Sequence, residues 1–325
     1  GHEIGQRDIG LVPDAHDHRH RRGRNGPHHH RFVERPQVFQ RPAAAHQQQH
    51  VAGTMRAGVA AGGGQRGVVR LRRLYVDHCE IAVAVRRLPR GKSPGPSQMK
   101  AESIKEWLGH WETATEAEQP IGNNHPWLVF RALIRHVSST GNLPARMAHA
   151  TCVLLPKPDG GVRGLGLLEV CWKVIATILT RRLISSIEFH DSLHGFRPAR
   201  GTRTAIIEAK LFQQLAAIER VPAFEIFLDL HKAYDAVDRG RLMEILEAYG
   251  VGPLTRTLLR NYWDAQKFVA RQGGYYGRPF NLGRGLTQGD PMSPILFNIV
   301  CDAVVRAWLR DVLPGSEATT GIGGR

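Results

Sequence analysis

A change in amino-acid composition near residue 75 determines which part of this 325-residue chain can fold. Residues 1–74 hold 13 arginines, no lysine and five acidic residues, a net charge of +8. They contain glutamine and glycine runs and no extended helical or strand period. Such a segment buries too little apolar surface to offset the entropy lost on ordering. We therefore predict that residues 1–74 form a disordered, low-complexity Arg/His-rich arm, and that the folded part begins near residue 75.

The charge of the whole chain favours a polyanionic partner. It has 44 basic and 29 acidic residues, a formal net charge of +15. Nucleic acid is the commoner partner for such a charge, and no run of 18 apolar residues predicts a membrane span. Four cysteines lie far apart without zinc-ligand spacing, so we interpret them as buried thiols of a reducing, intracellular compartment. They are Cys79, Cys152, Cys171 and Cys301.

After residue 75, hydrophobic periodicity predicts many helices and few, separated strands, which is the α+β class. Strands are expected over 151–155, toward Leu167 and over 223–230, and a β-hairpin over 268–282. The expected helices span 101–111, 127–137, 168–187, 202–218, 239–249, 254–263 and 294–312.

The tripeptide Gly91-Lys92-Ser93 matches the end of a phosphate-binding P-loop, but its surroundings do not. A P-loop needs a glycine five residues before Gly91, where Arg86 stands. Pro94 also follows at once, where the P-loop needs a helix to begin. The sequence therefore excludes a P-loop nucleotide hydrolase.

The most informative segment, 227–239, reads Phe-Leu-Asp-Leu-His-Lys-Ala-Tyr-Asp-Ala-Val-Asp-Arg. An apolar strand would end on the carboxylate of Asp229, the kind of hard oxygen ligand that Mg²⁺ takes. Tyr234, Asp235 and Asp238 follow. A turn and a helix N-cap explain the last two aspartates, so Asp229 is the candidate metal ligand.

A second segment, 284–298, reads Arg-Gly-Leu-Thr-Gln-Gly-Asp-Pro-Met-Ser-Pro-Ile-Leu-Phe-Asn. Gly285 and Gly289 would let the backbone approach a ligand closely, and Gln288 offers both a donor and an acceptor. Taken alone, the segment could also be a loop that leads into a helix.

Together the two segments resemble the palm of reverse transcriptases, closest to those of group II introns and non-LTR retroelements. The resemblance extends over about 88–313, with five blocks in the family's order, which is far more specific than any one block. The blocks are Arg-Gly-Lys-Ser-Pro-Gly-Pro at 90–96, Leu-Pro-Lys-Pro-Asp-Gly-Gly-Val-Arg at 155–163, His-Gly-Phe-Arg-Pro-Ala-Arg-Gly-Thr at 194–202, motif A at 229–235 and motif B at 288–294.

The resemblance implies a right-hand polymerase fold in which helices pack on a small antiparallel sheet. Residues 75–220 would form the N-terminal extension and the fingers, and residues 221–325 a partial palm with motifs A and B. The sequence lacks the Tyr-X-Asp-Asp motif that supplies the remaining metal-binding carboxylates, and it lacks a thumb. Because one carboxylate cannot hold two Mg²⁺ ions about 4 Å apart, we expect this chain alone not to polymerise DNA.

The resemblance also assigns roles to single residues. Asp229 would be catalytic and would bind Mg²⁺, with the backbone carbonyl of Leu230 as a further ligand. The ring of Tyr234 would occupy the space of a ribose 2′-OH and so select deoxynucleotides.

Further residues of the resemblance would hold substrates. Lys157 and Arg163 would grip the triphosphate, the lysine as a point charge and the arginine as a bidentate fork. Gln288 and Gly289 would pack against the nucleotide and the templating base. Arg197 and Arg200 would contact the nucleic-acid backbone or the palm.

The implied function is that of a fragment of a retroelement RNA-directed DNA polymerase. Its partners would be an RNA template, a DNA primer and dNTPs, with Mg²⁺ required in the complete polymerase. The alternative is a non-catalytic, basic nucleic-acid-binding remnant of the palm, whereas Tyr234 argues against an RNA-dependent RNA polymerase. The polymerase interpretation requires residues 227–229 to lie in a sheet, and Asp229 and Gln288 to face one pocket.

Overall fold

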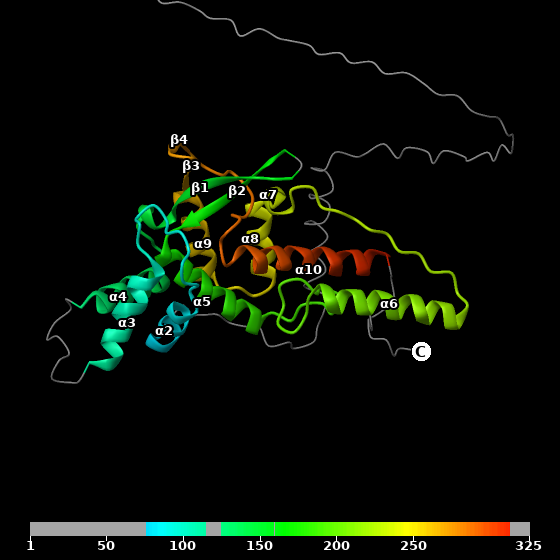
Figure 1. Cartoon of the computed structure of the whole chain (residues 1–325). Helices are drawn as coiled ribbons and strands as arrows, with labels where there is room; N and C mark the ends of the chain where they lie inside the picture. The colour runs from blue at the N-terminus through cyan, green and yellow to red at the C-terminus, as the bar shows by residue number, and fades with distance from the viewer. Residues whose placement is uncertain (1–75, 115–124, 159, 313–325) are drawn as a thin grey trace, which may run out of the picture. The chain divides into compact units, whose positions relative to one another are not determined.

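The computed structural model describes residues 76–114, 125–158 and 160–312 (Figure 1). The predicted arm, residues 1–74, lies outside the described residues. The described chain combines helices with one small sheet, which confirms the α+β class. Its elements are α2 (His78–Arg87), α3 (Ala101–Thr113), α4 (Pro126–Thr140), η1 (Ala145–Ala148), β1 (His149–Pro156), β2 (Val162–Leu168), α5 (Val170–Ser186), α6 (Thr202–Glu219), α7 (Ala233–Ala236), α8 (Arg239–Ala248), α9 (Pro253–Ala265), β3 (Lys267–Gln272), β4 (Tyr275–Phe280) and α10 (Ser293–Val312).

Local capping chemistry explains where several helices begin and end. Asp77 and Glu80 form a capping box at the start of α2, and Asp238 caps α8 through the Arg241 amide, as predicted. Helix α4 ends at Gly141, whose φ of 72° is the left-handed conformation that glycine adopts without strain. The predicted helices are therefore confirmed, with ends that shift by a few residues.

The four strands lie in the order β2-β1-β3-β4. The β1–β2 and β3–β4 pairs are antiparallel, but β1 and β3 are parallel, with His149 opposite Lys267 and Val153 opposite Arg271. The prediction of an antiparallel sheet is therefore wrong in part, because the sheet is mixed. Helices separate β1–β2 from β3–β4 along the chain, and a connection that long permits a parallel pair.

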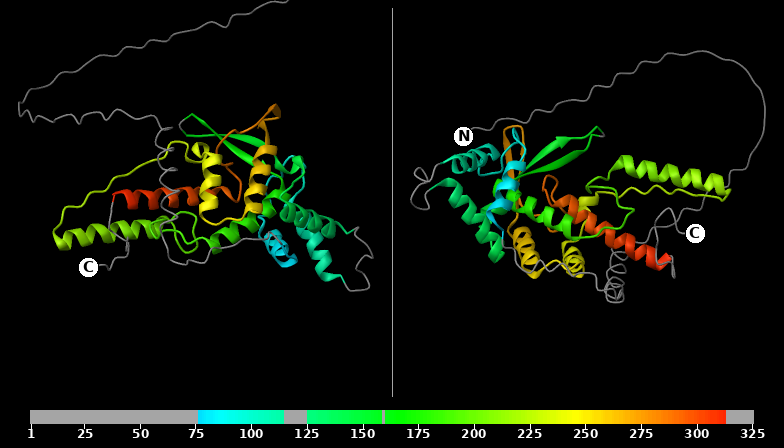
Figure 2. Two further views of the ribbon diagram at one scale, coloured as in Figure 1. Left: turned by 180° about the vertical axis from the view of Figure 1, so that it is seen from behind. Right: turned by 90° about the horizontal axis from the view of Figure 1, so that it is seen from below.

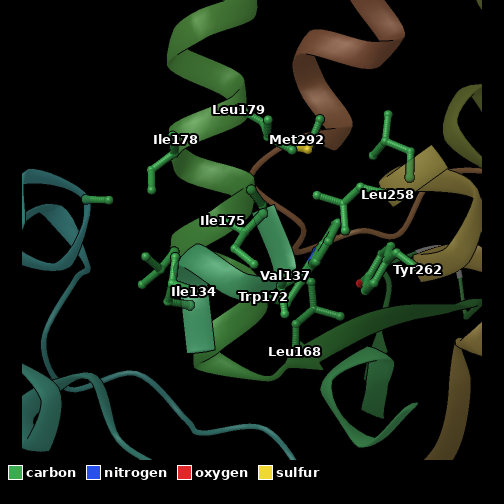
Figure 3. Close-up of a cluster of buried hydrophobic side chains, with 14 of the residues drawn as sticks. Ile134, Val137, Leu168, Trp172, Ile175, Ile178, Leu179, Leu258, Tyr262 and Met292 are labelled. Atoms are coloured by element: carbon green, nitrogen blue, oxygen red, sulfur yellow. The ribbon is translucent and has the colours of Figure 1, made fainter. Parts of the chain in front are cut away.

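The core lies where the sheet meets α4, α5 and α9 (Figure 3). The rings of Trp172 and Tyr262 stack with centroids 3.4 Å apart and planes 6° apart. Leu168 from β2 and Phe268 from β3 are also buried there. Burying each side chain of this size stabilises the fold by roughly 1.5–3 kcal/mol.

A buried carboxylate joins α10 to two other parts of the fold. Asp302, fully buried, accepts hydrogen bonds from the His190 amide at 2.6 Å and the Tyr249 hydroxyl at 2.5 Å. It also pairs with Arg306 at 2.6 Å. Burial, together with the Asp302 carboxylate, raises the pKa of the Tyr249 hydroxyl, which stays protonated and keeps donating. These contacts hold α10, whose first turn reaches the site described below.

The predicted strand over 223–230 is wrong, because the structure has no strand there. The segment is extended and returns alongside α6 (Figure 2), where Gln213 donates to Glu225 at 2.9 Å. Phe224 and Phe227 are 84% and 89% exposed, and the large apolar side chains of α6, such as Leu211 and Phe212, are exposed as well. The run has high strand propensity, but a strand also needs a neighbour for its N–H and C=O groups, and none of the described strands pairs with it.

The prediction of buried thiols is also wrong. Cys79 is exposed, and Cys152, Cys171 and Cys301 are only partly buried. Burial raises the pKa of the Cys171 thiol to about 12, so that side chain is an unreactive thiol at neutral pH. Among the described helices, none is both long enough and apolar enough to cross a membrane.

The exposure of residues 223–230 leads to a first prediction. Phe227→Ala is expected to change the free energy of unfolding by no more than about 0.5 kcal/mol, because the ring has few packing partners. Phe268→Ala in β3 is the matched control and is expected to cost about 3–5 kcal/mol, since that ring is only 2% exposed. Urea unfolding followed by circular dichroism measures both values. A loss above 2 kcal/mol for Phe227→Ala would instead place the segment in a packed strand.

Candidate nucleotide pocket

A pocket of about 360 Å³ lies between β2, the α7 turn and the segment 287–294. Four of its residues were predicted to bind the nucleotide: Arg163, Tyr234, Gln288 and Gly289. The other lining residues are Thr287, Asp290, Ser293 and Pro294. The structure therefore brings together residues from the β1–β2 hairpin, motif A and motif B, which are far apart in the sequence.

On one side, the motif B loop lies against β2 without an intervening side chain. The Gly166 amide donates to the Gln288 carbonyl at 2.8 Å. A Cβ added at Gly289, whose φ is 103°, would lie 2.6 Å from the Gly166 carbonyl oxygen, and one added at Gly166 would lie 2.6 Å from the Thr287 side chain. Glycine is required at both positions for this close approach.

On its other side, the same loop is bound to the motif A turn. The Leu286 amide donates to the Tyr234 carbonyl at 2.9 Å, and the Gly285 amide donates to the Val237 carbonyl at 2.8 Å. Gly285 has a φ of 86°, and a Cβ there would lie 2.9 Å from the Asp235 Cα. The segment before motif B is therefore coupled through its backbone to the turn that ends motif A, and this coupling places Tyr234 and Gln288 at one pocket.

The ring of Tyr234 is fixed by packing. It stacks on Phe297 of α10, with centroids 5.2 Å apart and planes at 25°. Partial burial raises the pKa of the Tyr234 hydroxyl, so the side chain is a neutral phenol at physiological pH. The pocket wall at this point is therefore a rigid, uncharged ring.

Asp290 faces the protein core more than the pocket. Its carboxylate accepts from Trp172 Nε1 at 2.8 Å and from the Met292 amide at 2.9 Å. Burial raises the pKa of Asp290, while those hydrogen bonds and the nearby Lys173 act in the opposite direction. Asp290 thus anchors the loop to the aromatic core.

A polar network of Arg239 and Gln266, which was not predicted from the sequence, supports the loop. Arg239 donates to the carbonyls of Gly285 and Leu282, each at 2.9 Å, and to Gln266 at 2.8 Å. Gln266 is buried and donates to Thr287 Oγ1 at 3.0 Å. No local pattern marks either residue, because their partners come from other parts of the chain.

The predicted metal ligands do not join this pocket. Asp229 and Leu230 lie on the exposed extended segment and are not among the lining residues. Over the described ranges, no group of three or more Asp, Glu, His or Cys side chains could hold a metal ion. The expected sheet at 227–229 is absent, Asp229 does not share the pocket of Gln288, and the described residues do not fit a two-metal site. The geometric requirement set for the polymerase interpretation is therefore not met by the described residues, and the family assignment rests on the comparisons with known proteins.

The remaining predicted contacts lie elsewhere. Lys157 is exposed at the tip of the β1–β2 hairpin and does not line the pocket. Arg197 donates to the carbonyls of His190 and Leu193 at 2.8 and 2.9 Å, and Arg200 pairs with Asp191 at 2.6 Å. Both guanidinium groups hold the loop before α6, and their contact with nucleic acid stays a prediction.

The close packing of the motif B loop leads to a second prediction. Gly285→Ala is expected to lower the free energy of unfolding by roughly 1–3 kcal/mol, because a positive φ disfavours alanine and its Cβ would meet the Asp235 backbone. Gly283→Ala is the control, since no atom lies within 4 Å of its added Cβ, and it is expected to stay within about 0.5 kcal/mol. Chemical unfolding of both variants tests the difference, and equal losses would contradict the described approach.

Comparison with known proteins covers four of the five blocks, since 90–96 lies before the range that the family model matches. The family model "Reverse transcriptase (RNA-dependent DNA polymerase)" matches residues 155–319, about half of the chain. Two relatives are similar over part of their length. The first is the "Retrovirus-related Pol polyprotein from type-2 retrotransposable element R2DM" of Drosophila melanogaster, which is 25% identical over 73% of this chain and 21% of that protein. The second is the "Putative COX1/OXI3 intron 2 protein" of Saccharomyces cerevisiae, which is 30% identical over 46% of this chain and 16% of that protein.

The chain thus spans about a fifth of the length of these two relatives. A "Reverse transcriptase-like protein" of Chlamydomonas reinhardtii is 26% identical over 59% of this chain and 49% of that protein. The match to the family model covers the β1–β2 hairpin and both motifs that line the pocket. The chain therefore belongs to the reverse transcriptase family, of the type found in non-LTR retrotransposons and group II introns.

Proposed function

We propose that the pocket of Arg163, Tyr234 and Gln288 receives the incoming dNTP of a retroelement RNA-directed DNA polymerase. The observation that carries the proposal is the convergence of these residues, from three separate segments, on one pocket. In the complete protein the partners would be an RNA template, a DNA primer and dNTPs. Residues 75–220 would then be the extension and fingers, and residues 221–325 the partial palm.

The chemistry of the lining suits a nucleoside triphosphate. Arg163 is exposed and has no ion pair among the described residues, so its guanidinium is available to a phosphate as a bidentate donor. Lys157, on the same hairpin, would add a second positive charge to the triphosphate. Gln288 and Gly289 would border the base, where an amide side chain and a bare backbone leave room for a flat ring.

Tyr234 would select the sugar. Its ring is held by Phe297, and its backbone carbonyl is held by the Leu286 amide, so it cannot easily move aside. A ring fixed in this way would exclude the ribose 2′-OH.

Catalysis belongs to the complete polymerase in this proposal. Two Mg²⁺ ions held by Asp229, the Leu230 carbonyl and further carboxylates would supply the nucleotidyl transfer chemistry when bound. The described residues do not assemble such a site. Arg197 and Arg200 would act on the nucleic-acid backbone or through the loop that they hold.

The alternative function is nucleic-acid binding without catalysis. The exposed position of Asp229 and the absence of a carboxylate cluster among the described residues favour it. This alternative needs the basic charge but no formed nucleotide pocket. Measured binding of a dNTP at Arg163 would therefore favour the polymerase origin over a generic binding remnant.

Binding of dATP and ATP, followed by isothermal titration calorimetry, tests the pocket. Arg163→Ala is expected to weaken dATP binding by roughly 10- to 100-fold, because a charge-assisted hydrogen bond is lost. Arg260→Ala removes an exposed arginine of α9 that does not line the pocket, and it should leave dATP binding unchanged. Equal affinities for wild type and Arg163→Ala would overturn the assignment.

The sugar gate has its own test. Tyr234→Ala is expected to raise ATP affinity relative to dATP by about tenfold, because space for the 2′-OH is opened. An unchanged ratio would remove the gate from Tyr234 and leave the pocket as a general nucleotide site.

Primer extension tests the separation of binding from chemistry. With an RNA template, a DNA primer, dNTPs and Mg²⁺, we expect this chain to give no extension above background, because Asp229 stands apart from other metal ligands in the described structure. Sustained extension that Asp229→Asn abolishes would show that the carboxylates assemble on substrate binding.

A further inference from the structure

The segment 223–230 and helix α6 expose an apolar surface that the nucleotide pocket does not use. Ile226, Phe227 and Leu228 are 82–89% exposed. Helix α6 adds large apolar side chains that are 45–75% exposed, namely Leu211, Phe212, Leu215 and Ile218. An exposed apolar surface of this extent marks a site of interaction with another molecule.

Contacts within the chain hold the segment beside α6. The Val221 amide donates to the Ala216 carbonyl at 3.0 Å, and Gln213 donates to Glu225 at 2.9 Å. The segment runs back along the helix from this turn (Figure 2). The exposed apolar side chains of the two elements therefore belong to one surface.

The segment has the side-chain pattern of a strand but lacks a neighbouring strand. Alternate side chains of an extended chain lie on opposite sides, and the even-numbered ones are all apolar, namely Phe224, Ile226, Leu228 and Leu230. None of the described strands pairs with the segment. Unpaired N–H and C=O groups along an exposed extended chain are a template for pairing with another chain.

A second copy of this chain supplies a matching strand. Two identical segments that pair antiparallel about a two-fold axis satisfy the main-chain groups of both, and the pair closes because each copy uses the same surface. The rings of Phe224 and Phe227 in two copies would remove roughly 600–1,000 Å² from water. That is about half of what a stable dimer interface buries, roughly 1,200–2,000 Å², and the aliphatic side chains around the rings add to it.

Charge and proline exclude most registers of such a pair. A two-fold pair is centred on one residue, which lies opposite the same residue of the second copy. Centring on Phe227 places Glu225 opposite Asp229, and centring on Asp229 places two Asp229 carboxylates opposite each other, and like charges in these positions destabilise a ladder. Centring on Ile226 brings Pro222, which has no N–H to donate, into the ladder.

The register centred on Leu228 avoids these conflicts. It places Glu225 opposite His231 of the second copy at both ends, and Ile226 opposite Leu230 of the second copy. Opposite charges and apolar pairs in these positions each stabilise an antiparallel ladder. Residues 225–231 are all exposed, so no contact of the core must be broken for them to pair.

We propose that this chain forms a symmetric dimer through an antiparallel two-stranded ribbon, made of residues 225–231 from each copy and centred on Leu228. Two strands alone are marginally stable in water, so the apolar side chains of α6 would pack on the ribbon. The proposal does not rest on the nucleotide pocket, whose lining residues lie outside 225–231. The stability expected for Phe227→Ala refers to the monomer, at concentrations below the dissociation constant of the dimer.

Sedimentation equilibrium of the full chain over a range of concentrations tests the dimer. Leu228→Lys would place two lysines opposite each other and is expected to weaken dimerisation at least tenfold. Val129→Lys changes an exposed apolar residue of α4 in the same way, and this control should dimerise as the wild type does. A wild type that stays monomeric, or that grows into open-ended assemblies, would overturn the proposal.

A charge exchange tests the register. Glu225→Lys is expected to weaken the dimer several-fold, because the lysine would lie opposite His231 of the second copy. The double variant E225K/H231E should regain the wild-type dissociation constant. Failure of the second substitution to restore the dimer would contradict the pairing of these two residues.

Disulfide cross-linking locates the centre of the ribbon. In a Cys79→Ser background, which removes an exposed thiol, Leu228→Cys should form a covalent dimer on oxidation, because residues directly opposite each other have Cβ atoms about 5 Å apart. Ile226→Cys alone should not cross-link, whereas a mixture of Ile226→Cys and Leu230→Cys chains should. Equal self-linking at 226 and 228 would contradict the proposed register.

One further variant separates the dimer from the proposed function. Arg163→Ala should dimerise as the wild type does, whether or not it binds dATP. Circular dichroism spectra establish that each variant is folded. Dimerisation lost in Arg163→Ala and kept in Leu228→Lys would place the interface at the nucleotide pocket and overturn the proposal.

Discussion

Backbone hydrogen bonds from the loop 285–288 to β2 and to the turn that carries Tyr234 hold the candidate site together. Gln288 is bound to Gly166 of β2, while Gly285 and Leu286 are bound to the turn that carries Tyr234. Because these contacts are between main chains, they require glycine where a Cβ would enter the space of the neighbouring backbone. This loop therefore determines where the pocket side chains lie. Arg163 is on β2 and Tyr234 is on the turn, and the loop is hydrogen-bonded to the backbone of both segments.

A polar layer below the loop makes that arrangement stable. Arg239 and Gln266 satisfy carbonyls and a hydroxyl of the loop, and Trp172 satisfies the buried carboxylate of Asp290. Buried polar groups without such partners would cost free energy, so a loop of this kind can be buried only when the surrounding elements supply them. The aromatic pair of Trp172 and Tyr262 links this layer to the apolar core.

The residues expected to bind a nucleotide lie apart from the residue expected to bind the metal. Four of the five residues expected to contact a nucleotide line one pocket, Lys157 being the exception, whereas Asp229 lies on an exposed, extended segment with no strand beside it in the described chain. A pocket that is lined by loops can form without a strand at 223–230. A metal site, in contrast, needs several carboxylates from different segments within a few ångströms of one another.

Periodicity and capping signals in the sequence were enough to predict seven of the helices and the two hairpins, because those elements depend on neighbours a few residues away. Helix α2 and the short α7 were not predicted. The ordered blocks of the resemblance were enough to select Arg163, Tyr234, Gln288 and Gly289. Tertiary structure alone decided the parallel pairing of β1 with β3, the anchoring role of Asp290 and the support from Arg239. It also left 223–230 unpaired despite its strand propensity, since pairing depends on a partner that local sequence does not contain.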